Sequence, residues 1–456
     1  MPTRTIDRPN VVVFFTDQQR WDSTGVHGNP LGLTPTFDRM AQEGTHLAQA
    51  FTPQPVCGPA RSCLQTGLYA TTTGCFRNLI PLPNDATTLA HHFRDAGYAT
   101  GYIGKWHLGS STPRDTEPVP AARRGGYEDW LAANALEMTS DAYDTVVHDT
   151  ENRRVKLPGY RVDALTDAAI RYVDAHQDNP FFLFVSYLEP HHQNHLDDYP
   201  PPTGYREHYT GRWMPPDLAA LGGTAHQHLA GYWGMVKRLD EALGRLLDAL
   251  QSLDLLERTI VLFTSDHGCH FNSRDHGQKQ TCHDASIRVP MAIQGPGFDA
   301  GGRLHQPVSL LDIPPTLLAA AGLPVPGELQ GRSILPLLRG ESDDWPAEVF
   351  VQISGAQVER CVRTRRWKYS VVAPDRDGRV DSGADRYVER FLYDLQADPY
   401  ELTNLIEFES HAPVRAALRE RLVQRMVAAG EAPPVVDPGP TRPSGQRRVS
   451  PGEMQA

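Results

Sequence analysis

Short runs of β-branched and aromatic residues alternate with segments of helical periodicity along the first two thirds of this chain. The helix candidates cover residues Thr88–Gly97, Arg161–His176 and Ala225–Leu253. The strand candidates are Val11–Phe15, Tyr98–Gly104, Phe181–Tyr187, Thr259–Asp266 and Val289–Gly297. This alternation is typical of a parallel sheet that is covered by helices, so the sequence predicts an α/β fold.

Two of these strand candidates run directly into an acidic residue. Val11–Phe15 is followed by Asp17, and the strand that starts at Thr259 ends at Asp266. Open α/β sheets build their sites at the carboxyl ends of their strands. We therefore expect Asp17 and Asp266 to converge at one edge of the sheet.

The pattern changes near Asp343 to shorter strand candidates followed by one helix. We expect residues 1–343 to form a catalytic domain and residues 344–432 a smaller C-terminal α+β domain. Residues 433–456 are rich in proline, glycine and charge, and we expect them to form a mobile tail. The new strand candidates are Glu348–Ser354, Gln357–Thr364, Lys368–Ala373 and Arg390–Leu395, and the helix candidate is Ala412–Gly430.

Composition excludes several classes of protein. No apolar run approaches the roughly eighteen residues that cross a bilayer, so no membrane partner is expected. The formal net charge of -11 argues against a nucleic-acid partner. The N-terminal stretch has no apolar signal core, which predicts a cytoplasmic location. Six cysteines in 456 residues are too sparse for a disulfide framework, and we expect reduced thiols.

Cys57 allows two interpretations from its own neighbourhood. A nucleophilic thiol needs a partner histidine and a helix N-terminus that lower its pKa, and no histidine lies nearby in the sequence. A lone cysteine is more often a small buried apolar side chain. The residues around Cys57 decide between these interpretations only through a resemblance.

The chain resembles the type I, formylglycine-dependent sulfatase family of the alkaline phosphatase superfamily. The residues CGPAR (57–61) followed by SCLQTG are similar to the signature C-x-P-x-R of that family, with Ala60 where most members have serine. Other landmarks follow in the order of the family: PNVVVFFTDQQRWD (9–22), GYIGKWHLG (101–109), LEPHH (188–192), TSDHG (264–268), KQTCHDASIRVPMAIQGPG (279–297), SLLDIPPTLLAAAGL (309–323) and FLYDLQADPYELTNL (391–405).

The resemblance implies a fold and an activity. The expected fold is an alkaline-phosphatase-like mixed sheet flanked by helices, with a smaller C-terminal domain of a short antiparallel sheet and a helix. The expected activity is hydrolysis of a small sulfated substrate, a sulfate monoester, to an alcohol and inorganic sulfate. Cys57 would be oxidised to Cα-formylglycine by a formylglycine-generating enzyme, and Arg61 would orient it.

The resemblance also implies a divalent metal ion. Asp17, Gln18, Asp266 and His267 match the metal ligands of the family, and a hydroxyl of the hydrated residue 57 would complete the set. Oxygen ligands favour Ca²⁺, while an imidazole ligand leaves Mn²⁺ as the alternative. Taken singly, TDQQ (16–19) and TSDHG (264–268) are each also compatible with an ordinary polar turn that follows a strand.

Four further residues carry implied catalytic roles. Lys105 would hold a sulfate oxygen, and His107 would contact a diol hydroxyl of residue 57. His191 would meet the substrate oxygen, and Lys279 would bind sulfate and aid the leaving group. His192, His270, Arg274 and His276 are possible substrate contacts, against the alternative that they belong to solvated loops.

Two other functions fit the same residues. Phosphonate monoester hydrolases share the formylglycine site, so a phosphonate or phosphodiester substrate is the nearer alternative. A non-catalytic anion-binding protein, in which Cys57 stays a thiol, is the alternative of a different class. The alcohol half of the substrate depends on loops, which vary independently of the fold.

Overall fold

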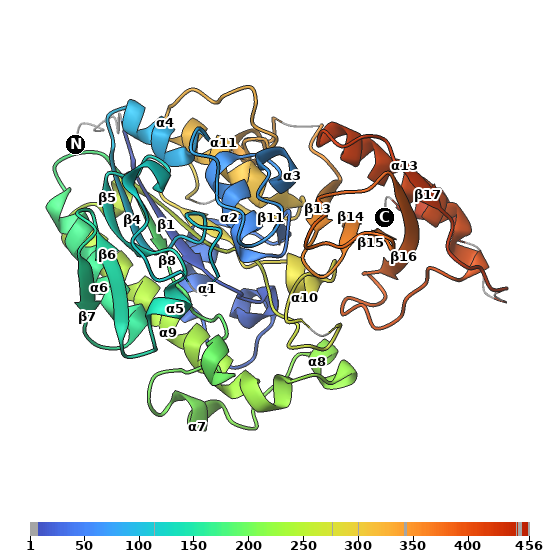
Figure 1. The fold of residues 1–456 in the computed structure, drawn as a ribbon, viewed down its shortest axis with the longest axis horizontal. Helices are drawn as coiled ribbons and strands as arrows, with labels where there is room; N and C mark the ends of the chain where they lie inside the picture. Colours follow the sequence, from blue (N-terminus) through green and yellow to red (C-terminus); the bar gives the residue numbers. More distant parts are fainter. Residues whose placement is uncertain are drawn as a thin grey trace.

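The described residues fold around two large, separate sheets (Figure 1). The structure is a computed structural model, and it describes residues 8–113, 115–275, 277–299, 301–341, 344–443, 445 and 449–454. A ten-stranded sheet forms the larger, N-terminal part, and a five-stranded sheet forms the C-terminal part. The predicted fold class is confirmed.

The large sheet is mixed, with parallel strands at its centre. The central strands β9, β1, β8, β4 and β5 are parallel neighbours, whereas β10, β6 and β7 pair in antiparallel fashion. In sheet order the strands are β11 (Gly302–Leu304), β2 (Thr45–Leu47), β10 (Ala292–Gln294), β9 (Thr259–Ser265), β1 (Asn10–Thr16), β8 (Phe181–Ser186), β4 (Ala99–Lys105), β5 (Asp129–Ala133), β6 (Thr145–Asp149) and β7 (Arg154–Leu157).

Helices cover both faces of this sheet, which explains why its central strands are continuously apolar. Alternate residues of β1 enter different cores: Val11, Val13 and Phe15 pack in one, and Val12 and Phe14 pack in the other. The first core includes α2 (Cys57–Thr66), α4 (Leu89–Asp95) and α11 (Ile313–Ala320), and the second includes α1 (Pro35–Glu43), α6 (Arg161–Ala175) and α9 (Ala225–Ser252).

The connections contain shorter elements. A two-stranded sheet pairs β3 (Ala50–Phe51) with β12 (Val308–Ser309). The short helices are α3 (Ala70–Thr73), α5 (Leu136–Thr139), α7 (Tyr205–Tyr209), α8 (Pro216–Leu221), α10 (Asp284–Ile287) and α12 (Leu335–Leu338). Within the described ranges, every helix is too short or too polar to span a bilayer.

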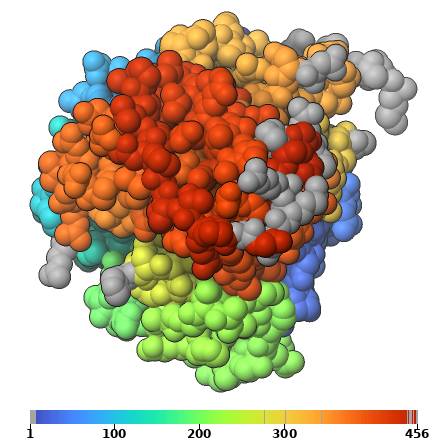
Figure 2. All heavy atoms as spheres, turned by 90° about the vertical axis from the view of Figure 1, so that its right-hand side faces the viewer, coloured from blue at the N-terminus to red at the C-terminus, as the bar shows by residue number. Residues whose placement is uncertain are grey.

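The C-terminal part packs one long helix against its sheet and covers one end of the molecule (Figure 2). Four strands are antiparallel neighbours, and the fifth, β17, pairs with β16 in parallel fashion. β17 belongs to the segment that the sequence analysis expected to form a tail. The elements are β13 (Glu348–Ile353), β14 (Val358–Thr364), β15 (Trp367–Ala373), β16 (Arg386–Asp394), α13 (Ala412–Ala428) and β17 (Val435–Asp437).

A buried ion cluster joins the two parts of the chain. Asp284, the first residue of α10, accepts hydrogen bonds from Arg363 Nη2 on β14 at 2.9 Å and from Lys368 Nζ on β15 at 2.7 Å. The backbone N–H of Asp284 donates to Glu401 Oε2 at 2.7 Å, and Glu401 also pairs with Lys368. Burial alone would raise the pKa of Asp284, but Arg363 and Lys368 hold it well below its usual range.

Replacing Asp284 with alanine is expected to destabilise the protein by about 3–5 kcal/mol, because Arg363 is left buried with an uncompensated charge. Urea unfolding followed by tryptophan fluorescence measures the change. Glu151→Ala, which removes an ion pair with Arg153 whose side chains are 72% and 62% exposed, is the control and is expected to leave stability unchanged. An Asp284→Ala protein as stable as this control would contradict the assigned role of the cluster.

Candidate active site

Adjacent parallel strands bring the acidic residues together. β1 and β9 are in register, with Thr16 opposite Ser265, so Asp17 and Asp266 follow paired residues at the same edge of the sheet. The backbone N–H of Asp266 donates to the Thr16 carbonyl at 3.2 Å. The expected convergence of Asp17 and Asp266 is confirmed. β4, two strands away across β8, ends at Lys105 on the same edge.

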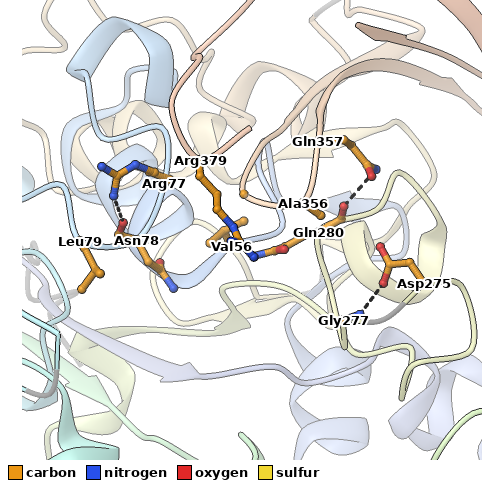
Figure 3. A pocket seen from close by; sticks show the side chains of 11 residues that line it. Val56, Arg77, Asn78, Leu79, Asp275, Gly277, Gln280, Ala356, Gln357 and Arg379 are labelled. Carbon is orange, nitrogen blue, oxygen red and sulfur yellow. Dashed lines mark hydrogen bonds between the residues drawn. The ribbon is translucent and has the colours of Figure 1, made fainter. Parts of the chain in front are cut away.

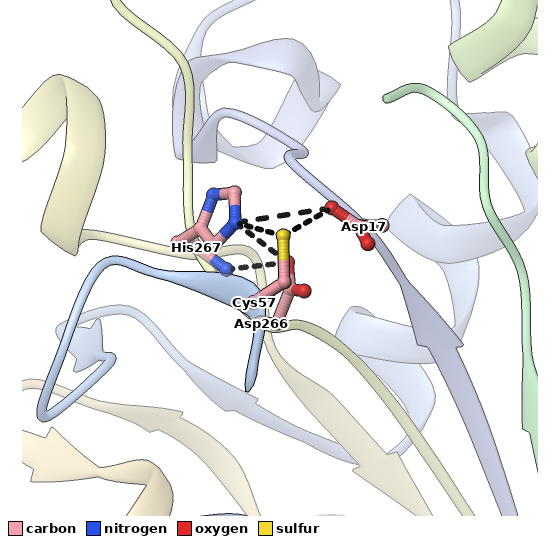
Figure 4. Close-up of side chains that lie close together, drawn as sticks. All are labelled: Asp17, Cys57, Asp266 and His267. Atoms are coloured by element: carbon pink, nitrogen blue, oxygen red, sulfur yellow. Dashed lines mark hydrogen bonds and ion pairs between the residues drawn. The ribbon is translucent and has the colours of Figure 1, made fainter. Parts of the chain in front are cut away.

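Cys57 is the first residue of helix α2, and its side chain is directed at the strand ends (Figure 4). Its Sγ atom lies 2.8 Å from Lys279 Nζ, 3.2 Å from His267 Nε2 and 3.5 Å from Asp17 Oδ1. Cys57 is only 1% exposed. Charged groups therefore enclose residue 57, and its surroundings differ from those of a cysteine packed in a hydrophobic core.

The surroundings of Cys57 favour a negative charge. Burial raises the pKa of a thiol, but Lys279, Lys105 and His267 together hold the pKa of Cys57 well below its usual value. The N-terminus of α2 adds the positive end of the helix dipole to the same position. A site with this charge distribution stabilises an anion at residue 57.

Two buried cations balance the two buried carboxylates. Arg61, one turn into α2, donates to Asp17 Oδ2 at 3.0 Å and lies 3.3 Å from Asp266 Oδ2. Lys105 Nζ donates to Asp17 Oδ2 at 2.8 Å and lies 3.2 Å from Glu137 Oε1. Arg61 thus holds the carboxylates in place.

The charges on the two carboxylates are compensated unequally. Burial would raise the pKa of Asp17, but the charges of Lys105 and Arg61 help to hold it well below its usual range. Burial and the adjacent Asp17 raise the pKa of Asp266 to about 6. Asp266 Oδ2 is buried and accepts no hydrogen bond from the described residues. Asp266 Oδ2 therefore faces the charge of Arg61 at 3.3 Å but keeps free acceptor capacity.

His267 and Gln18 each place a further side-chain atom, Nε2 and Oε1 respectively, near the site formed by Asp17, Asp266 and Cys57. The Nδ1 atom of His267 donates to the Gly268 carbonyl at 2.9 Å, so Nε2 is the ring nitrogen that faces the two carboxylates. That Nε2 lies 3.6 Å from Asp266 Oδ1 and 3.8 Å from Asp17 Oδ1. Tyr199 anchors the amide nitrogen of Gln18 at 3.1 Å, and Lys279 Nζ lies 3.3 Å from the opposite atom, Oε1.

This set of residues fits a divalent cation. Ligand atoms from Asp17, Cys57, Asp266 and His267 all lie within 4.8 Å of one another and are buried. Carboxylate oxygens of Asp17 and Asp266 and the Nε2 atom of His267 are the kinds of donor atom that such an ion requires, and Asp266 Oδ2 accepts no hydrogen bond from the described residues. A cation here would also offset the repulsion that raises the pKa of Asp266.

The remaining predicted catalytic residues surround Cys57. His191 donates from Nδ1 to the His192 carbonyl at 2.6 Å, which leaves Nε2 facing Lys279 Nζ at 3.4 Å. Burial lowers the pKa of His191, so its imidazole is neutral near pH 7. His107, two residues beyond the end of β4, lies close enough to Cys57 to lower the pKa of the thiol by hydrogen bonding.

The four possible substrate contacts have different surroundings. His192 Nε2 lies 3.0 Å from Asp197 Oδ1, beside the ring of Tyr199. His270 is fully buried, with Nε2 3.2 Å from the Lys279 carbonyl. Arg274 donates to the carbonyls of Tyr400 and Glu401 at 2.6 and 2.7 Å, and so fastens its loop to the C-terminal part. His276 lies outside the described residues.

Sequence analysis missed three residues that hold this site together. Glu137 shares Lys105 with Asp17, and Ser186 Oγ accepts from Arg61 Nη1 at 2.6 Å. Asn78 Oδ1 accepts from the Gly58 N–H at 2.9 Å, next to Cys57. Only Ser186 carried a signal, since it ends a predicted strand; Glu137 and Asn78 lie in segments without a recognisable pattern.

Comparison with known proteins gives a consistent result. The family model described as Sulfatase matches residues 9–323, and the model described as N-sulphoglucosamine sulphohydrolase, C-terminal, matches residues 274–428. The Ulvan-active sulfatase of Formosa agariphila is 31% identical over 441 residues, which cover 93% of this chain and 82% of that protein.

Solved structures share the fold. The YidJ protein of Bacteroides fragilis, described as a sulfatase, superposes with a TM-score of 0.81 at 26% identity and covers 94% of this chain and 98% of its own. The phosphonate monoester hydrolase of Agrobacterium radiobacter has a TM-score of 0.67 at 24% identity, with 92% and 96% covered.

Calcium chloride at millimolar concentration is expected to raise the melting temperature of EDTA-treated protein, because an ion that binds only the folded state stabilises it. Asp17→Asn and Asp266→Asn each remove a charged ligand and are expected to abolish this shift in differential scanning fluorimetry. Asp248→Asn, an exposed carboxylate on α9, is the control and keeps the shift. Equal calcium shifts in all four proteins would rule out the assigned ligands.

Proposed function

Because the chain belongs to the sulfatase family and is a sulfuric ester hydrolase, we propose that it cleaves its sulfate monoester with a formylglycine derived from Cys57. The observation that carries this proposal is the position of Cys57, buried at the start of α2 and within 3.5 Å of Lys279, His267 and Asp17. A hydrated formylglycine supplies an oxygen nucleophile where the thiol Sγ now stands. A formylglycine-generating enzyme would act before the site closes around residue 57.

We assign the metal site to Asp17, Gln18, Asp266 and His267, together with residue 57. Two carboxylates and an amide oxygen favour Ca²⁺, and the imidazole of His267 keeps Mn²⁺ as the alternative. A bound divalent cation would supply positive charge against the sulfuryl oxygens. Arg61 acts as a positioning residue, because it contacts both carboxylates and keeps them at the start of α2.

Lys105, Lys279 and His107 complete the binding of the sulfuryl group. Lys105 is fully buried beside Asp17, and Lys279 lies against Sγ, so two ammonium groups border residue 57. Developing negative charge on the sulfuryl oxygens is stabilised by such fixed cations in a site without bulk water. His107 is placed to accept a proton from residue 57.

Lys279 is the best-placed proton donor for the leaving alcohol. The Nε2 lone pair of neutral His191 accepts from Lys279, so His191 orients the ammonium group. Burial lowers the pKa of Lys279, but Cys57 and Asp17 outweigh this effect and raise it above the usual value. The carboxylates of Asp17 and Asp266, which also raise the pKa of Lys279, remain when residue 57 is a formylglycine, so Lys279 stays protonated beside residue 57, where the ester oxygen departs.

We also propose that residues 1–343 form the catalytic domain and residues 344–432 the C-terminal domain. The separate sheets and separate hydrophobic cores of the two parts support this division. β17 and its partner β16 tie part of the remaining segment to the C-terminal domain.

Cys57→Ala is expected to lower sulfatase activity by at least about 10⁴-fold, because the nucleophile is lost. Release of sulfate from 4-nitrophenyl sulfate measures the effect, and Cys63→Ala, a buried cysteine of the same helix, is the matched control. Mass spectrometry of the wild-type peptide should show an aldehyde at residue 57. An intact thiol with full activity would refute the proposal, and faster turnover of a phosphonate monoester would favour the alternative substrate.

Lys279→Ala is expected to slow hydrolysis of alkyl and sugar sulfates by about 10²–10⁴-fold, as for the loss of a general acid. Hydrolysis of 4-nitrophenyl sulfate should fall much less, because nitrophenolate leaves without a proton. Lys237→Ala, on the partly exposed side of α9, serves as the control. Equal losses on alkyl and nitrophenyl esters would show that Lys279 does not protonate the leaving group.

A further inference from the structure

A cavity of about 670 Å³ lies between the two parts of the chain, and its lining includes Val56, the residue before Cys57 (Figure 3). One wall comes from the loop after α3, with Arg77 and Asn78, and a second from the loop that contains Asp275 and Gln280. The C-terminal part supplies the third wall, including Arg379. The volume falls within the range of about 300–1,000 Å³ that is usual for small-molecule sites. We call this space the arginine cavity.

Three lining residues connect the arginine cavity with the active site through neighbouring residues. Val56 immediately precedes Cys57, and Asn78 Oδ1 accepts from the N–H of Gly58 at 2.9 Å. Gln280 follows Lys279, whose Nζ lies 2.8 Å from Cys57 Sγ. Because Lys279 is the group proposed to meet the leaving oxygen, the arginine cavity lies where the alcohol half of the substrate would extend.

The two arginines of this cavity have no acidic partner. Within the part of the chain that the structure describes, neither Arg77 nor Arg379 forms an ion pair, although most arginines of this acidic protein do. Among the described residues, Arg77 Nη1 donates to the Asn78 carbonyl at 2.9 Å, and none accepts a hydrogen bond from the buried Nε of Arg77. In Figure 3 Arg77 lies on the left of the cavity, the side chain of Arg379 reaches its middle, and Asp275 lies on the right.

The rest of the lining suits a molecule with many hydroxyl groups. Asn78, Gln280 and Gln357 present amides, and Asp275 presents a carboxylate that also accepts from the Gly277 N–H at 2.8 Å. Amides and carboxylates bind hydroxyl groups as donors and acceptors. A guanidinium group binds a carboxylate or a sulfate through two parallel hydrogen bonds. The lining therefore combines recognition of a polyhydroxyl molecule with recognition of an anion.

We propose that the arginine cavity binds an acidic sugar, whose second anionic group, a carboxylate or a sulfate, is held by Arg77 and Arg379 while its sulfate ester reacts at residue 57. This inference rests on the proposed function and adds the class of alcohol to it. It also gives the C-terminal part a role in specificity, since Arg379 and Gln357 both belong to that part.

Two pairs of sulfate esters that differ in one anionic group test the proposal. Glucosamine 2-N,6-O-disulfate is compared with N-acetylglucosamine 6-O-sulfate for a sulfate-type anion. Glucuronic acid 2-O-sulfate is compared with glucose 2-O-sulfate for a carboxylate. For at least one pair, the wild-type protein is expected to hydrolyse the ester with the second anionic group with a kcat/KM about tenfold or more higher. A hydrogen bond to a charged group contributes an effect of about this size. Arg77→Gln and Arg379→Gln should each reduce that ratio, and the double variant should remove it.

Arg376→Gln is the matched control, because Arg376 lies near Arg379 in sequence but pairs with Asp381 and Asp385 outside the cavity. It should keep the wild-type preference. Equal kcat/KM values within both pairs, or a preference that survives in the double variant, would overturn the proposal.

Calorimetric binding of the same four esters to Cys57→Ala provides a readout that does not depend on turnover. A preference for an acidic ester that is lost with both arginines would support the cavity even if catalysis failed, whereas equal binding within each pair would overturn it. Lack of turnover of every ester by wild-type protein with a verified aldehyde would instead refute the proposed function.

Discussion

Parallel pairing of β1 with β9 is the constraint on which the site depends. β1 ends at Thr16, which lies opposite Ser265, the last residue of β9. The residues that follow, Asp17 and Asp266, therefore place their carboxylates side by side at the carboxyl ends of the strands. A slip of one residue would turn each side chain of β1 to the other face. Such a slip is opposed by the cores on both faces, since Val12 and Phe14 fit one core and Val13 and Phe15 fit the other.

The price of that convergence is the burial of like charges. Asp17 and Asp266 are both fully buried, and uncompensated burial of carboxylates is costly. Arg61 and Lys105 offset part of the repulsion from the start of α2 and the end of β4. The remaining deficit is centred on Asp266, whose pKa is raised to about 6. The fold thus leaves a position that a divalent cation would stabilise, directly beside residue 57.

The elements that could be predicted from the sequence are those whose buried positions are also apolar. β1 and β9 were predicted because every residue of these strands is buried, so their apolar runs are continuous. α9 was predicted because its buried apolar residues recur at helical spacing. β5, β6 and β7 were missed, since they form by pairing at a sheet edge and carry mixed polarity. β17 was missed for a similar reason, because only its pairing with β16 makes it a strand.

The site shows the same division. Asp17 and Asp266 were placed together by the general rule for strand ends, and Cys57 was singled out through a motif. Glu137 and Asn78 escaped notice because their contacts with Lys105 and Gly58 arise from tertiary packing alone. The arginine cavity escaped for a stronger reason: Arg77 and Arg379 are about three hundred residues apart in the sequence, and only the tertiary structure brings them into the lining of one cavity.

A crystal structure of the purified protein grown with calcium, with the ion located by anomalous scattering, tests the central claim most directly. The account predicts one ion in contact with Asp17, Gln18, Asp266, His267 and an oxygen of residue 57, with its oxygen ligands at the distances of about 2.3–2.6 Å that are usual for Ca²⁺. An unmodified thiol at residue 57, with no ion between the two carboxylates, would contradict it.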